Sequence, residues 1–102
     1  MTYHGSVRFE WDPAKNEANR QKHDLGFGEA AHLFTSGADY LVLADETHAE
    51  REDRFIAIGP ISRGLILVVW TERLEDTVRI ISARFATRRE VELFRRYTED
   101  ER

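Results

Sequence analysis

The segment that most constrains the fold is residues 65–70, an uninterrupted run of the apolar residues Leu-Ile-Leu-Val-Val-Trp. Six residues are too few for a membrane span, which needs about 20, but they suit a β-strand. Because this run is apolar at every position, both faces of the strand are expected to be covered. Turn-forming segments at 60–64 and 72–76 flank it. The run therefore predicts the central strand of a β-sheet.

Further strand segments surround this run. Residues 53–59 precede it and residues 77–85 follow it, each separated from it by one short turn. Strands joined by short turns pair in antiparallel fashion. Residues 7–11 alternate apolar and charged side chains, and residues 40–44 are apolar and β-prone. The sequence thus predicts an antiparallel sheet of about four to five strands.

Three helices complete the predicted fold. Asp12-Pro13 is an N-cap followed by a proline at the first helical position, and this helix is expected to run to about His23. A second, short helix is expected over residues 28–35. Residues 87–90, Thr-Arg-Arg-Glu, form a capping box, which starts a helix to about Tyr97. Two N-terminal helices, a sheet and one C-terminal helix make an α+β domain.

Length and composition exclude several classes of protein. The 102 residues suit one domain, with a structured core at about 8–97, and 41% apolar residues argue against disorder. The absence of cysteine excludes disulfides, thiolate zinc sites and a cysteine nucleophile. The four histidines lack metal-ligand spacing, so neither a metal nor a cofactor is expected. Without a secretion signal, a soluble cytoplasmic protein is the expectation.

Charge is distributed unevenly along the chain. The net charge is −4, yet residues 77–97 hold six arginines against two glutamates, whereas residues 27–53 hold seven acidic residues and one arginine. Arginine outnumbers lysine by 13 to 2. Because a guanidinium binds phosphate or carboxylate through paired hydrogen bonds, these arginines either bind an anion or pair with the acidic stretch.

Hairpin register places two arginines together. If Gly59 pairs with Gly64, Arg54 lies opposite Val69; in the next hairpin, Val69 then lies opposite Arg79. The two arginines would occupy one row across three strands, with their side chains on the same face. Such a row predicts an anion between them.

The anion has two candidate identities. Glu52, expected in the next row, would neutralise the arginines internally; alternatively, an RNA phosphate would bind there. A carboxylate or histidine beside arginines suits cleavage of RNA without metal, because the base removes the 2′-OH proton and the arginines stabilise the phosphorane. Arg73 is expected in the turn near this end. Arg84 has the opposite parity, so only a bulge or the end of the strand would bring it there.

The first helix carries a second candidate group. Lys15, Asn19 and Lys22 or His23 recur on one side of it, at the spacing of successive turns. The helix dipole would favour the charged forms of Lys22 and His23 at the C-terminal end. This side is either part of a catalytic site or an ordinary solvated face.

Together, these motifs resemble the BrnT family, the toxin half of a bacterial type II toxin–antitoxin pair. The segments that carry the resemblance are Phe9-Glu10-Trp11-Asp12-Pro13, Lys22-His23 with Phe27, and Arg79-Ile80-Ile81-Ser82-Ala83-Arg84. The resemblance implies a RelE-like fold and a ribonuclease that arrests translation by cleaving RNA, free or on the ribosome. It also implies neutralisation by a BrnA antitoxin, with DNA bound only through that antitoxin.

The resemblance also suggests roles for individual residues. Candidates for contact with the scissile phosphate are Arg54, Arg73, Arg79 and Arg84. Candidates for proton transfer or phosphate positioning are Lys22, His23 and Glu52. A competing hypothesis from another class is a non-catalytic interaction module, which would bind an acidic or DNA-binding partner through the arginine-rich end of the sheet.

Overall fold

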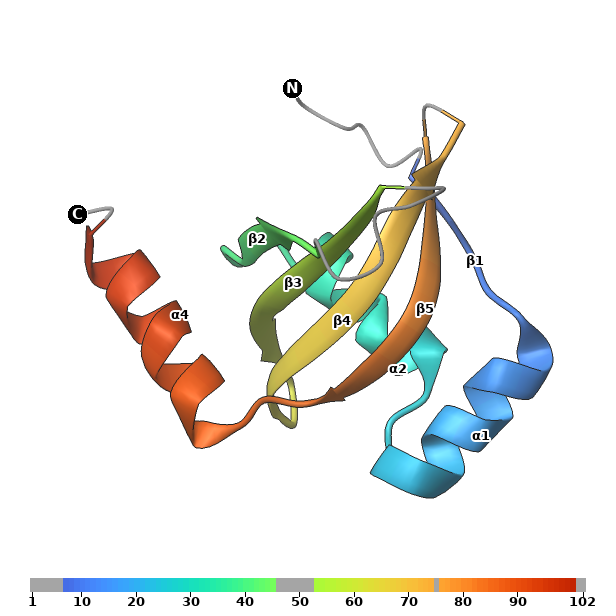
Figure 1. Ribbon diagram of the computed structural model, residues 1–102, viewed down its shortest axis with the longest axis horizontal. Helices are drawn as coiled ribbons and strands as arrows, with labels where there is room; N and C mark the ends of the chain where they lie inside the picture. The colour runs from blue at the N-terminus through green and yellow to red at the C-terminus, as the bar shows by residue number, and fades with distance from the viewer. Residues whose placement is uncertain (1–6, 46–52, 75, 101–102) are drawn as a thin grey trace.

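The computed structural model describes residues 7–45, 53–74 and 76–100. They form one five-stranded sheet with the strand order β1-β5-β4-β3-β2 and four helical segments (Figure 1). The strands are β1 (Arg8–Glu10), β2 (Leu41–Ala44), β3 (Arg54–Ile61), β4 (Gly64–Arg73) and β5 (Thr77–Phe85). The helices are α1 (Pro13–His23), α2 (Phe27–Ala30), α3 (His32–Thr35) and α4 (Arg88–Asp100). The predicted α+β class is confirmed, and so is the central position of the strand that contains residues 65–70.

The sheet is mixed, which corrects the prediction of a purely antiparallel one. Strands β2 to β5 pair antiparallel to their neighbours, as expected for chain segments joined by tight turns. Strand β1 instead runs parallel to β5 along the other edge. Because these two strands come from opposite ends of the chain, no tight turn dictates their relative direction.

The N-terminal helices form largely as predicted. The Asp12 carboxylate caps α1 by accepting a hydrogen bond from the backbone N–H of Ala14 at 2.8 Å, and the helix ends where Asp24 adopts a left-handed conformation (φ 56°). The single helix expected over residues 28–35 is instead two short ones, α2 and α3, with Ala31 between them.

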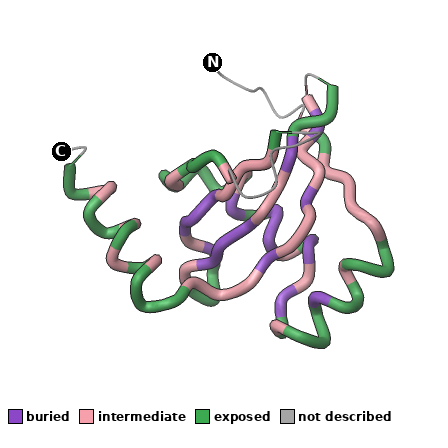
Figure 2. The backbone as a smooth tube through the Cα atoms, viewed as in Figure 1, coloured by how far each residue is buried: buried purple, intermediate pink, exposed green. Residues whose placement is uncertain are grey.

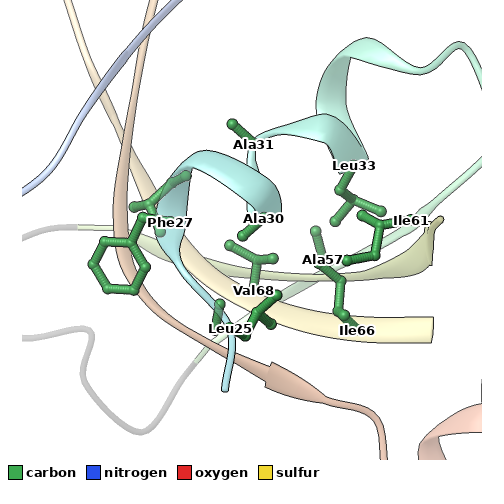
Figure 3. Packing of buried hydrophobic residues seen from close by; sticks show 11 residues of the cluster. Leu25, Phe27, Ala30, Ala31, Leu33, Ala57, Ile61, Ile66 and Val68 are labelled. Atoms are coloured by element: carbon green, nitrogen blue, oxygen red, sulfur yellow. The ribbon is translucent and has the colours of Figure 1, made fainter. Parts of the chain in front are cut away.

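These helices cover one face of the sheet. In Figure 1, α2 lies behind the strands, and Figure 3 shows Ala30 of α2 beside Val68 of β4, with Leu33 of α3 beside Ala57 and Ile61 of β3. Figure 2 places the buried backbone at the centre of the sheet and in the α2 region. The fully buried large side chains are Phe27, Leu25, Leu33, Ile58, Ile66, Ile80 and Val68. Most of them fill the space between α2, α3 and the sheet.

Gly59 on β3 permits a close approach between layers. A Cβ atom there would lie 2.6 Å from Leu33 Cδ1 and 2.7 Å from Tyr40 Cβ, shorter than any ordinary carbon contact. Only a residue without a side chain therefore lets α3 and the segment before β2 pack against this strand.

Helix α4 is attached differently. The predicted capping box is present, since the Thr87 N–H donates to Glu90 Oε1 at 2.9 Å and the Glu90 N–H donates to Thr87 Oγ1 at 3.2 Å. The helix continues to Asp100, beyond the expected end near Tyr97. None of its residues is buried, and it projects from the end of β5 toward β3 (Figures 1 and 2).

Candidate functional site

Arg54 and Arg79 do share one row across three strands. Arg54 lies opposite Thr71, and Thr71 lies opposite Arg79. The residue between the arginines was predicted to be Val69, so each hairpin register is wrong by two residues. A shift of two leaves every side chain on its predicted face, because side chains alternate with a period of two. The predicted pairing of the two arginines across the sheet is therefore retained.

The row extends to a carboxylate that the sequence analysis did not assign to the site. Glu10 on β1 lies opposite Arg79, and Arg79 Nη1 donates a hydrogen bond to Glu10 Oε2 at 2.8 Å. Both side chains are partly exposed, 34% for Arg79 and 41% for Glu10. The alternation of residues 7–11 predicted on which side of its own strand Glu10 lies. It did not predict which strand would pair with that one. Glu52, the carboxylate predicted in the next row as the internal partner of the arginines, lies outside the described residues.

A β-bulge brings Arg84 to the same face. The pairing changes from Trp70 opposite Ile80 to Val69 opposite Ser82, which leaves Ile81 as the extra residue. Arg84 consequently lies opposite Leu67, on the face that Thr71 also occupies. A bulge is one of the two routes that parity had left open for this arginine.

Arg84 is engaged by an internal carboxylate. Its Nη1 and Nη2 donate to Glu90 Oε1 and Oε2, each at 2.8 Å. These hydrogen bonds lower the pKa of Glu90 to about 2, and the hydrogen bond from the Thr87 backbone also lowers it. The same pairing raises the pKa of Arg84. Arg84 therefore fixes the first turn of α4 to the sheet.

Arg73 lies at the tip of β4, at the end of the sheet where Arg54 and Arg79 lie. It is exposed and lines a shallow hollow of about 320 Å³ together with Asp53, Phe55, Thr71 and Glu72. Thr71 is buried, and its hydroxyl donates to the Asp53 carbonyl at 2.6 Å. The structure thus gathers Arg54, Arg73 and Arg79 at one end of the sheet face opposite α2 and α3, which we call the open face.

The structure does not join Lys22 and His23 to these arginines. Both lie in the last turn of α1, which packs against β5, and no hydrogen bond or ion pair within the described residues links them to the sheet arginines. Asn19, predicted to share their side of the helix, is instead buried. Its amide nitrogen donates to the carbonyls of Leu25 (2.8 Å) and Ala83 (2.7 Å), and its oxygen accepts from the Ala83 N–H. Its role is structural.

Among residues 7–45, 53–74 and 76–100, no three histidine, aspartate or glutamate side chains gather to hold a metal ion. Within the same segments, no helix has the length and apolar character needed to cross a membrane.

The fold and the open face together define a small α+β domain with a row of arginines on one face of its sheet. Residues 11–90 match the family described as "Ribonuclease toxin, BrnT, of type II toxin-antitoxin system". The chain belongs to this family, and it is thereby a ribonuclease toxin of a type II toxin–antitoxin system.

A solved structure supports the assignment. The chain is similar to the crystal structure of the Brucella abortus ribonuclease toxin BrnT, with 26% sequence identity and a TM-score of 0.60. The match covers 80% of this chain and 99% of the Brucella chain. No curated protein matches this sequence significantly.

Proposed function

We propose that the open face of the sheet cleaves RNA without a metal ion. The observation that carries this proposal is the row Arg54–Thr71–Arg79, which continues to Glu10 on the partly exposed face. Arg79 uses Nη1 for Glu10, and its remaining N–H groups have no partner among the described residues. A phosphate bound there would contact Arg79 and, at the tip, Arg73.

The reaction is a transesterification. A base removes the 2′-OH proton, the 2′-oxygen attacks phosphorus, and the 5′-oxygen leaves with a proton from a general acid. Arginines stabilise the extra negative charge on the phosphorane oxygens. The product ends are a 2′,3′-cyclic phosphate and a 5′-hydroxyl. Glu52, His23 and Lys22 remain candidate proton-transfer residues. Arg84 remains a candidate for contact with the phosphate, from a position in which it is also hydrogen-bonded to Glu90.

The proposed partner is a BrnA-type antitoxin in the cytoplasm. Val91 and Leu93 on α4 are 38% and 44% exposed, which gives such a protein an apolar surface to cover. DNA would then be bound through the antitoxin and not by this chain.

The test is expression in a bacterial host. We expect the wild-type chain to slow growth with loss of intact RNA, and Arg79→Ala to relieve both effects. Arg20→Ala is the matched control, because Arg20 is an exposed arginine on α1 paired with Glu17. Cleavage by the purified chain should persist in EDTA and leave cyclic phosphate ends. Wild-type chain that is as harmless as Arg79→Ala, with RNA intact, would favour the non-catalytic interaction module.

A further inference from the structure

A second hollow lies on the helix-covered side of the sheet, beside the Arg73 end. It measures about 250 Å³, and aromatic rings form much of its wall. The Phe34 ring centroid is 5.4 Å from those of both Tyr40 and Trp70, and the Phe55 centroid is 5.0 Å from that of Trp70. Since pockets for drug-sized ligands span roughly 300–1,000 Å³, this one suits a single planar ring system.

Trp70, which lines this hollow, carries an unsatisfied hydrogen-bond donor. Its indole Nε1 is buried and has no hydrogen-bond partner among the described residues. Buried donors are nearly always paired in native proteins, so this one calls for an acceptor that the described residues do not supply. A ligand in the hollow that carries such an acceptor would satisfy it.

Two carboxylates, those of Glu72 and Asp76, also line the hollow. Glu72 is exposed and has no hydrogen bond or ion pair within the described residues. Asp76, by contrast, already accepts a hydrogen bond from the Thr77 hydroxyl at 3.2 Å. Glu72 is therefore the acceptor that remains open to a ligand with N–H donors.

The aromatic hollow adjoins the arginine face. Phe55 and Glu72 line both this hollow and the one that contains Arg73. A nucleotide at the tip of β4 would thus have a place for its base on one side and a guanidinium for its phosphate on the other.

We propose that the aromatic hollow binds a guanine base of the RNA substrate; this rests on the proposed ribonuclease function. Guanine stacks on aromatic rings, offers O6 and N7 as acceptors for the Trp70 indole N–H, and presents adjacent N1–H and N2–H donors to one carboxylate. Adenine, cytosine and uracil lack this adjacent pair of donors. Glu72 and Trp70 are accordingly specificity-determining residues.

The indole N–H resonances of the ¹⁵N-labelled full chain provide the test. There are two tryptophans, so Trp70→Phe assigns both signals. We expect guanosine 3′-monophosphate to move the Trp70 signal and leave the Trp11 signal in place, with a Kd about tenfold lower than that of cytidine 3′-monophosphate. Glu72→Gln should remove about this tenfold preference, whereas Glu92→Gln, which removes an exposed carboxylate on α4, should keep it.

Other outcomes overturn the proposal. A Trp70 signal that neither nucleotide moves, or that both nucleotides move with equal affinity, rules out a guanine site. So does a signal that only a purified cognate antitoxin moves, because the hollow would then be a peptide site. Cleavage that Arg79→Ala abolishes while the Trp70 signal stays unmoved keeps the ribonuclease and removes the base site. A guanine-specific shift of the Trp70 signal without any RNA cleavage keeps the base site and removes the ribonuclease function.

Discussion

The two faces of the sheet are built from the same strands but carry different side chains. One face packs against α2 and α3, where Phe27, Leu33 and Val68 form part of the hydrophobic core. The other carries Arg54 and Arg79 in a partly exposed row. Because successive strand residues point to opposite sides, each strand contributes to both faces at once. The parity of a residue in its strand thereby decides whether its side chain joins the core or the face that carries the arginines.

The two long helices repeat this contrast. Helix α1 inserts a buried side chain, Asn19, that hydrogen-bonds the backbone of β5. Helix α4 buries no residue and is fixed mainly at its first turn, where Glu90 binds Arg84. We therefore expect substitutions on the helix-covered side to affect folding of the whole domain, and those around α4 to act locally.

The largest effect is expected from Asn19→Ala. It leaves the buried N–H of Ala83 and two carbonyls without partners, which should reduce the free energy of unfolding by about 2–4 kcal/mol in urea titration. Gln21→Ala, at an exposed position of the same helix, should change it by no more than about 0.5 kcal/mol. Equal effects of the two variants would show that Asn19 does not anchor the helix.

Gly59→Ala should cost about 1–3 kcal/mol of unfolding free energy, because the new methyl group overlaps Leu33 and Tyr40. Gly28→Ala is the matched control. A Cβ there meets nothing within 4 Å, and alanine is the better helix former, so thermal unfolding should shift slightly upward. A tolerated Gly59→Ala would mean that α3 and β3 are not in close contact.

The Arg84–Glu90 pair should make the attachment of α4 sensitive to pH. The pKa of Glu90 is lowered from 4.5 to about 2, so its stabilising effect is complete above about pH 4.5 and is lost as the pH falls toward 2. Glu90→Gln should weaken the helix start by roughly 1.5 kcal/mol at neutral pH and remove this pH dependence.

Amide hydrogen exchange in the first turn of α4 measures the effect. Glu99→Gln alters an exposed carboxylate at the other end of the helix and should leave exchange in that turn unchanged. Protection that is the same in Glu90→Gln as in the wild type would show that this ion pair does not hold α4.

The smallest effect on stability is expected from Arg73→Ala on the open face. Its side chain is exposed and makes no hydrogen bond or ion pair within the described residues, so unfolding free energy should change by less than about 0.5 kcal/mol. RNA cleavage should nevertheless fall markedly. Full cleavage activity in this variant would show that Arg73 is not part of the site. One residue fewer on the open face would then differ in role from the residues of the core.

Local signals in the sequence predicted several elements with their observed bounds. Helix α1 begins after Asp12 and ends at His23, and β5 spans residues 77–85, as expected. The hairpins were each wrong by two residues, because glycine and proline mark a turn without fixing its length. Pro60, expected in the turn, lies within β3 opposite Leu65.

The site was predicted less completely than the fold. The arginine row followed from strand periodicity, which survives a shift of two residues. Glu10 was missed because its partner strand lies at the other end of the chain, and Asn19 was assigned to a solvated or catalytic side because helical spacing does not say which side faces the sheet. Arg84 reaches the open face only through the bulge at Ile81.

What the sequence determined by itself is local: where strands and helices begin, and which residues of a strand share a face. These depend on backbone propensity, capping and a fixed alternation of side chains. The tertiary structure decided that β1 lies beside β5, that a bulge moves Arg84 to the open face, and that Arg79 donates a hydrogen bond to Glu10. Such contacts join residues far apart in the chain, so they are set by how the layers pack as a whole and not by any short stretch of residues.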